Sequence, residues 1–78
     1  MKVILANYDC GDFYEVYTAP NIVKTMRDLW EDVYNDCLAE GKELSEEDSW
    51  FEDEQSQIVG IGGEYIAEFK VLETKERI

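Results

Sequence analysis

The chain of 78 residues contains no histidine, one proline, two cysteines and only seven basic residues. Without histidine, a general base at neutral pH would have to be a carboxylate, lysine, tyrosine or cysteine with a shifted pKa. Two cysteines, Cys10 and Cys37, are too few for a disulfide framework, and we expect both to be reduced thiols. The apolar run from Val3 to Ala6 is too short for a signal peptide or a membrane span. We therefore expect a cytoplasmic protein.

Neither a catalytic centre nor a specific metal site is expected. Cys10 is the one candidate nucleophile, but the neighbouring Asp9 and Asp12 raise the pKa of its thiol and oppose thiolate formation. The carboxylates do not follow the spacing of a calcium-binding loop, and two distant cysteines without histidine cannot form a zinc site. Residues 60–63 lack the glycine spacing of a phosphate-binding loop. The sequence thus predicts a protein that is not an enzyme and uses no cofactor.

Charge of one sign dominates what is present. Nineteen acidic residues stand against seven basic ones, which gives a formal net charge of −12. A domain of this size must carry nearly all of these charges on its surface, because burial of an unpaired carboxylate is costly. The resulting field repels nucleic acid and anionic membranes and attracts basic protein surfaces. We therefore expect a protein partner, with no direct contact to nucleic acid or membrane.

Short apolar and alternating segments predict four strands. Residues 2–8 carry apolar side chains on both faces, which is typical of an internal strand, and residues 13–17 complete an N-terminal hairpin. Residues 58–61 and 64–73 form a second hairpin around Gly62-Gly63. Alternation in the last strand divides its residues between two faces: Tyr65, Ala67, Phe69 and Val71 on one, and Ile66, Glu68, Lys70 and Leu72 on the other.

One amphipathic helix is predicted between the hairpins, with Thr18 as its N-cap, Pro20 in its first turn and Gly41 after its end near Glu40. Its inner stripe consists of Ile22, Met26, Leu29, Val33 and Cys37, widened by Val23, Trp30, Tyr34 and Leu38. Residues 1–78 are therefore expected to form a single α+β domain of order β-β-α-β-β, with this long helix packed on one face of an antiparallel sheet. Residues 42–57 are expected to be an acidic loop within it.

Four carboxylates at a spacing of four residues occupy the outer face of the predicted helix: Asp28, Asp32, Asp36 and Glu40. Like charges at this spacing destabilise a helix by roughly 0.2–0.5 kcal/mol per pair. Anions near the C-terminal end also interact unfavourably with the helix dipole. The row is either the solvated face of an acidic protein or a recognition surface for a basic groove.

A second group of carboxylates surrounds Trp50 and Phe51: Glu43, Glu46, Glu47, Asp48, Glu52, Asp53 and Glu54. Acidic residues beside large aromatic side chains suit a partner with both basic and apolar contacts, and tryptophan is frequent at interface hot spots. The alternative is that one of the two aromatic residues closes the end of a thin core. Trp50 is the expected apolar anchor for a partner.

Small size, strong acidity, carboxylate rows and one packed sheet together resemble the small inhibitors encoded by bacteriophages and mobile elements. These include DNA-mimic, anti-restriction and anti-CRISPR proteins and inhibitors of uracil-DNA glycosylase. The resemblance implies a phage protein that acts in a host cytoplasm and occupies the cationic nucleic-acid site of a host protein. The candidate partner-binding residues are Asp28, Asp32, Asp36, Glu40, Glu46, Glu47, Asp48, Trp50, Glu52, Asp53 and Glu54.

Another class of function also fits the composition, namely a small non-catalytic accessory or assembly module whose acidity serves solubility. Such a module would dimerise through the sheet face that the helix leaves open, with Ile66, Leu72, Ile4 and Tyr8 as candidate contacts. A third possibility is the general acidity of a protein from a salty habitat. The sequence therefore allows a monomer or a homodimer.

Overall fold

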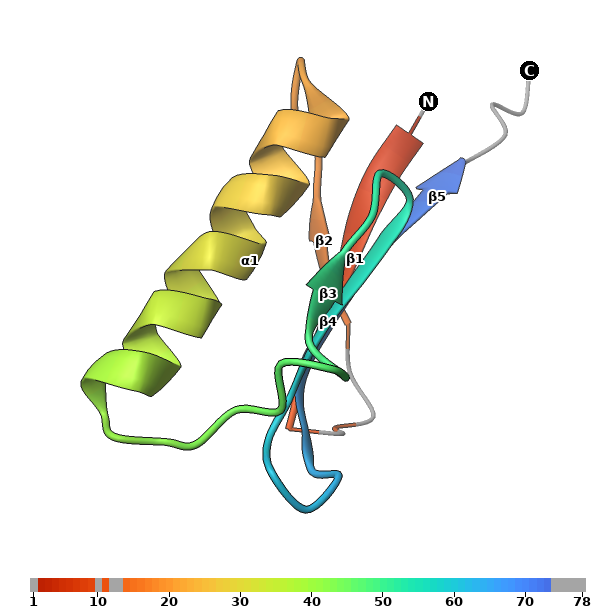
Figure 1. Cartoon of the computed structure of the whole chain (residues 1–78). Helices are drawn as coiled ribbons and strands as arrows, with labels where there is room; N and C mark the ends of the chain where they lie inside the picture. The colour runs from red at the N-terminus through yellow and green to blue at the C-terminus, as the bar shows by residue number, and fades with distance from the viewer. Residues whose placement is uncertain (1, 10, 12–13, 74–78) are drawn as a thin grey trace, which may run out of the picture.

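The computed structural model describes residues 2–9, 11 and 14–73 of the chain. Its elements are, in order, β1 (Lys2–Tyr8), β2 (Glu15–Tyr17), α1 (Ile22–Ala39), β3 (Trp50–Phe51), β4 (Gln55–Val59) and β5 (Tyr65–Glu73). The five strands form one antiparallel sheet in the order β2-β1-β5-β4-β3, and α1 packs across one face of it (Figure 1). The α+β fold class is therefore confirmed, and the short strand β3 is added to the four predicted strands.

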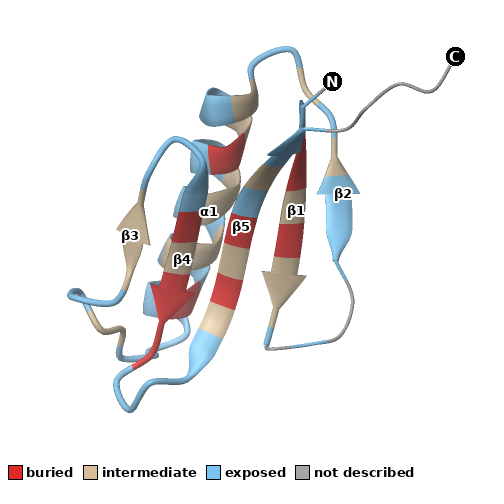
Figure 2. Cartoon of the chain, turned by 90° about the vertical axis from the view of Figure 1, so that its right-hand side faces the viewer, coloured by how far each residue is buried: buried red, intermediate tan, exposed pale blue. Residues whose placement is uncertain are grey.

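The core lies between α1 and the three inner strands, β1, β5 and β4 (Figure 2). Its fully buried members are Ile4, Ala6, Met26, Ile58, Ala67 and Phe69. Strand β1 pairs with β2 on one side and β5 on the other, and both Val3 and Ile4 are buried although they point to opposite faces. The prediction of an internal first strand is confirmed. Strand β2 is shorter than predicted in the described residues, and Phe13 lies outside them.

The helix begins later than the sequence indicated. Asn21 is the N-cap, with an extended backbone, and its side-chain oxygen accepts a hydrogen bond from the Lys24 backbone N–H at 3.1 Å. Asparagine is a stronger N-cap than threonine in general, and its side chain reaches the unsatisfied N–H groups of the first turn. Thr18 and Pro20 therefore precede the helix, and the predicted start was wrong.

The predicted end of the helix at Gly41 is confirmed. Gly41 has a φ of +80°, and the backbone N–H groups of Gly41 and Lys42 donate to the carbonyls of Leu38 and Cys37 at 3.1 and 2.9 Å. These two bonds form a Schellman motif, in which glycine is favoured because it has no Cβ to clash in the left-handed conformation. Leu38 at this end is exposed, as is Val23 at the other, so the apolar stripe is narrower than predicted.

Residues 42–57 do not form one open loop, because hydrogen bonds hold this segment against β4. The Ser45 backbone N–H donates to the Val59 carbonyl at 2.8 Å. The Ser49 hydroxyl donates to the same carbonyl at 3.1 Å and accepts from the Val59 N–H at 3.0 Å. The Gln57 side chain donates to the Asp48 carbonyl at 2.6 Å. The side chains of Ser49 and Gln57 thus make hydrogen bonds between β4 and the residues that precede β3. These bonds fix the backbone of the acidic segment.

A β-bulge changes the facing of residues at the start of β5. Ile58 pairs with Ala67, but the next residue of β4, Val59, pairs with Tyr65, so Ile66 is the extra residue. An extra residue reverses the alternation of side chains beyond it. As a result Ile66 packs against the core, while Tyr65 is 45% exposed. The predicted facing of these two residues was wrong, whereas that of Ala67 and Phe69 is confirmed.

Two serines in this part of the fold are expected to respond oppositely to alanine. Ser56 is fully buried between Phe51 and Phe69 of the neighbouring strands, and its hydroxyl has no hydrogen-bond partner. A buried polar group without a partner costs about 1–3 kcal/mol, so Ser56→Ala should raise the free energy of unfolding by about 1 kcal/mol. Ser49→Ala removes two hydrogen bonds and should lower it by about 1–2 kcal/mol. Urea unfolding of both variants tests this pair, and a loss of stability in Ser56→Ala would contradict it.

Candidate functional site

The predicted helix row is present on the surface of α1. Asp28, Asp32 and Asp36 are exposed along the helix, and Glu40 is its exposed C-cap. Both ends of the row carry ion pairs, because Asp28 lies 2.9 Å from the Lys24 ammonium and Glu40 lies 3.6 Å from that of Lys42. Such exposed pairs contribute little to stability, about 0–1 kcal/mol.

Asp32 and Asp36, in the middle of the row, make no ion pair with any lysine or arginine that the structure describes. No described basic side chain therefore offsets these two carboxylates on the outer face of α1.

The second predicted group forms what we call the acidic edge: Glu43, Glu46, Glu47, Asp48, Glu52, Asp53 and Glu54. All seven side chains are exposed, and they lie along β3 and the segment fastened to β4. Local hydrogen bonds shape this segment. Ser45 accepts from the Asp48 N–H at 3.3 Å and donates to the Asp48 carboxylate at 3.0 Å. The acidic edge is therefore a group of carboxylates on a fixed backbone.

The two aromatic residues of β3 have different roles. Phe51 packs against the core, with its ring 6.2 Å from that of Trp30 and with the Arg27 guanidinium 5.0 Å from its centroid. Trp50 is the neighbouring residue of the strand, so its side chain points to the opposite face. It is half-buried and is not among the residues packed on the core cluster. Phe51 thus closes the core, while Trp50 remains beside the acidic edge.

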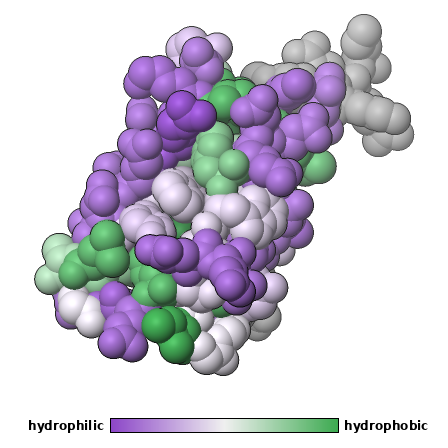
Figure 3. Space-filling model, in the orientation of Figure 1, coloured by the Kyte–Doolittle hydropathy of each residue, from purple (hydrophilic) through white to green (hydrophobic). Residues whose placement is uncertain are grey.

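The helix row and the acidic edge lie on different flanks of the molecule. The Trp30 indole N–H donates to the Gln57 carbonyl of β4 at 2.9 Å, which shows that this side of α1 faces the β3–β4 edge. At about 100° per residue, Asp28, Asp32 and Asp36 lie roughly 120–160° around the helix from Trp30. Figure 3 shows hydrophilic surface on the outer side of α1 and again over the β3–β4 side, with paler surface between them. The structure therefore does not gather all predicted site residues into one polyanionic surface.

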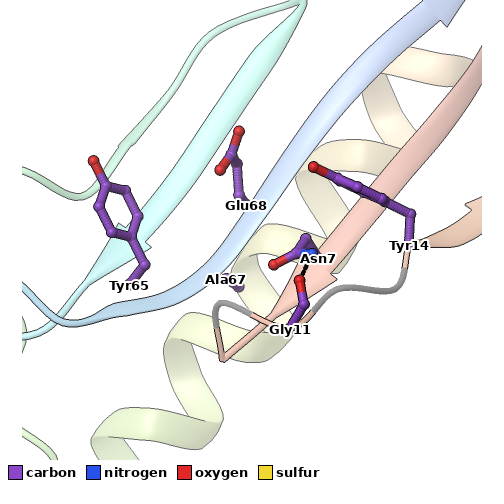
Figure 4. Close-up of a pocket in the computed structure, with 6 residues that line it drawn as sticks. All are labelled: Asn7, Gly11, Tyr14, Tyr65, Ala67 and Glu68. Atoms are coloured by element: carbon purple, nitrogen blue, oxygen red, sulfur yellow. Dashed lines mark hydrogen bonds between the residues drawn. The ribbon is translucent and has the colours of Figure 1, made fainter.

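A pocket that the sequence did not reveal opens on the sheet face away from α1 (Figure 4). It has a volume of about 220 Å³ and is lined by Asn7, Gly11, Tyr14, Tyr65, Ala67 and Glu68. The Asn7 side chain donates to the Gly11 carbonyl at 2.6 Å. Tyr65 reaches this face only because of the bulge at Ile66, and strict alternation hid it from sequence reasoning.

Of the two cysteines, Cys37 lies within the described residues. Cys37 is buried, and its burial raises the pKa of the thiol, which opposes nucleophilic reactivity. Cys10 and Asp12 lie outside the described residues. Within residues 2–9, 11 and 14–73, no three thiol or carboxylate groups are placed to hold a metal ion. Over the same residues, no helix combines the length and apolar character that a membrane crossing requires.

The acidic edge with Trp50 is thus the best-defined candidate surface, and the tyrosine-lined pocket is a second. Comparisons of the chain with protein-family models, with curated proteins and with solved structures find no match.

Proposed function

We propose that this protein binds a basic surface of a nucleic-acid-binding protein through the acidic edge and thereby excludes nucleic acid from it. The main support for the proposal is the high density of negative charge on a segment whose backbone is fixed by hydrogen bonds. The segment from Glu43 to Glu54 contains seven exposed carboxylates and no basic residue, and it is hydrogen-bonded along β4. Trp50 provides an aromatic side chain within the same surface.

A fixed backbone favours such binding because little conformational freedom is lost when the complex forms. Nucleic-acid sites are lined with lysine and arginine that contact phosphates, so exposed carboxylates are electrostatically complementary to them. The helix row lies on another flank and acts at longer range. Asp32 and Asp36 add to the negative field that steers the protein toward a basic partner, which raises the association rate.

In this proposal the protein acts by occupation and not by catalysis. It would serve as an inhibitor of the DNA-mimic type, as the resemblance to anti-restriction and anti-CRISPR proteins implies, and would work in the cytoplasm of a host cell. It needs no cofactor, and it makes no contact of its own with nucleic acid or membrane.

A competition experiment tests the proposal. The protein is titrated into complexes of a fluorescein-labelled DNA duplex with a nuclease or a repressor, and the anisotropy of the duplex is followed. We expect release of the duplex from at least one such protein, without binding of the duplex by the acidic protein alone. Direct binding of the acidic protein to the DNA-free target should be weaker at 150 than at 50 mM salt, because the contact is electrostatic. Failure to displace DNA from any member of a broad panel would count against the proposal.

The open sheet face supports a second candidate function, assembly of two copies. Val16 and Leu72 are exposed there, at 61% and 49%. The contact residues expected from the sequence need correction, however, because Ile4 is fully buried and Ile66 and Tyr8 pack on the core; only Leu72 remains available. Mass measurement in solution by light scattering distinguishes the two functions. A stable dimer that Leu72→Lys dissociates would favour assembly.

A further inference from the structure

The pocket on the open sheet face has aromatic walls and an anionic floor. Tyr14 and Tyr65 stand on its two sides, with Glu68 and Asn7 between them (Figure 4). The two tyrosines are 50% and 45% exposed, so both side chains are accessible from solvent. Tyr65 is turned to this face by the bulge at Ile66, and bulges of this kind commonly re-aim side chains at functional sites.

These walls and this floor suit a positively charged group. Aromatic faces attract cations through the negative potential over the ring, and arginine and lysine are the usual partners in proteins. A carboxylate binds a guanidinium through charge-assisted hydrogen bonds. The volume of about 220 Å³ is below the 300–1,000 Å³ usual for sites of drug-sized ligands, so it suits a single side chain better than a nucleotide or cofactor.

The carboxylate of the pocket is already paired with Lys70, a residue of the same strand that does not line the pocket. The Lys70 ammonium lies 2.9 Å from Glu68, and both side chains are partly exposed. Hydrogen bonding to Glu68 raises the pKa of Lys70. A planar guanidinium can stack on an aromatic ring and donate two parallel hydrogen bonds to a carboxylate. The ammonium of lysine is flexible and strongly hydrated, so it is a weaker match for a carboxylate between two aromatic rings. An external guanidinium could therefore displace Lys70 from Glu68.

We propose that this pocket binds the guanidinium of an arginine side chain presented by a partner protein, in competition with Lys70. Glu68 accepts hydrogen bonds from the guanidinium, and Tyr14 and Tyr65 stack against it. The site lies on the open sheet face, where Gln57 stands between Glu68 and Trp50 in the strand register, and none of its lining residues belongs to the acidic edge. It therefore goes beyond the proposed function and does not require the partner to bind nucleic acid.

The test uses N-acetyl-arginine amide as the probe, followed by two-dimensional NMR of the isotopically labelled chain. N-acetyl-citrulline amide is the matched control, because its side chain has nearly the same shape and no charge. We expect arginine to shift the amide signals of Tyr65, Glu68 and Lys70, and citrulline to leave them in place. Glu68→Gln should weaken the binding of arginine about tenfold or more, because the charge-assisted bonds are lost.

Lys70→Met provides a second test, which does not require Glu68→Gln to leave the sheet intact. Removal of the competing ammonium should strengthen arginine binding roughly twofold to fivefold, the usual strength of an exposed ion pair. Glu64→Gln is the matched control for a lost carboxylate, because Glu64 is exposed and does not line this pocket. Equal shifts with citrulline, equal binding of N-acetyl-lysine amide, or shifts located on the acidic edge would each overturn the proposal. Weaker binding by Lys70→Met would overturn it as well.

Discussion

Replacement of Trp30 by alanine is expected to lower the free energy of unfolding by about 3–5 kcal/mol, the usual cost of deleting a large packed aromatic side chain. Trp30 joins α1 to the β3–β4 edge through two contacts, and it also stacks on a residue of the helix itself. Its indole N–H donates to the Gln57 carbonyl at 2.9 Å, and its ring stacks on Tyr34 with centroids 5.0 Å apart. The ring also meets Phe51 edge-on. A chain of this length has a total stability of roughly 4–12 kcal/mol, so the variant should be near its unfolding limit.

Trp50 is the matched control within the same chain. Trp50→Ala should lower the free energy of unfolding by less than about 1 kcal/mol, because Trp50 lies outside the core cluster, whereas the equally half-buried Trp30 packs on it. Trp30→Phe should fall between the two, since it keeps the aromatic contacts and loses the hydrogen bond to Gln57. Urea unfolding followed by circular dichroism measures all three variants. Equal losses for the two alanine variants would show that Trp50 is as structural as Trp30.

Reversal of charge on the acidic edge is expected to have the largest effect on partner binding. In the DNA competition, Glu46→Lys with Glu47→Lys should weaken displacement by about 100-fold or more, because like charges placed against a basic surface cost several kcal/mol. Both side chains are exposed, so the fold should be retained. Trp50→Ala should also weaken displacement while leaving stability nearly unchanged.

The helix row provides a control of identical net charge. Asp32→Lys with Asp36→Lys raises the charge by the same amount, but on the other flank of the molecule. If these residues act only by steering, this variant should weaken displacement by less than about tenfold, mainly through a slower association rate. Equal losses for the two double variants would mean that net charge, and not the acidic edge, determines binding.

The sequence was sufficient for the main elements because their signals are local. The three- and four-residue spacing of Met26, Leu29 and Val33 located the helix, and Gly41 marked its end. The bulge at Ile66 and the strand β3 could not be predicted in this way. Both depend on pairing with β4, a partner that only the tertiary structure supplies. The helix start was missed because Pro20 favoured Thr18 as the cap, although Asn21 has the higher capping propensity.

The candidate site was predictable in composition and not in arrangement. Solvent exposure of the carboxylates follows from their cost of burial, and the structure agrees for every residue of the helix row and the acidic edge. Whether the two groups share a flank depends on the rotation of α1 over the sheet. The contacts of Trp30 with Gln57 and Phe51 link α1 to the β3–β4 edge, and no local pattern reveals them. The tyrosine-lined pocket was hidden for a similar reason, because the bulge controls the facing of Tyr65.

The most direct measurement is an NMR map of the labelled protein bound to the nuclease or repressor that it displaces from DNA. We expect the largest signal changes at residues 43–54 and at the Trp50 indole N–H, with little change at Asp32 and Asp36. Changes centred on the helix row, or spread evenly over the molecule, would contradict the proposed binding through the acidic edge.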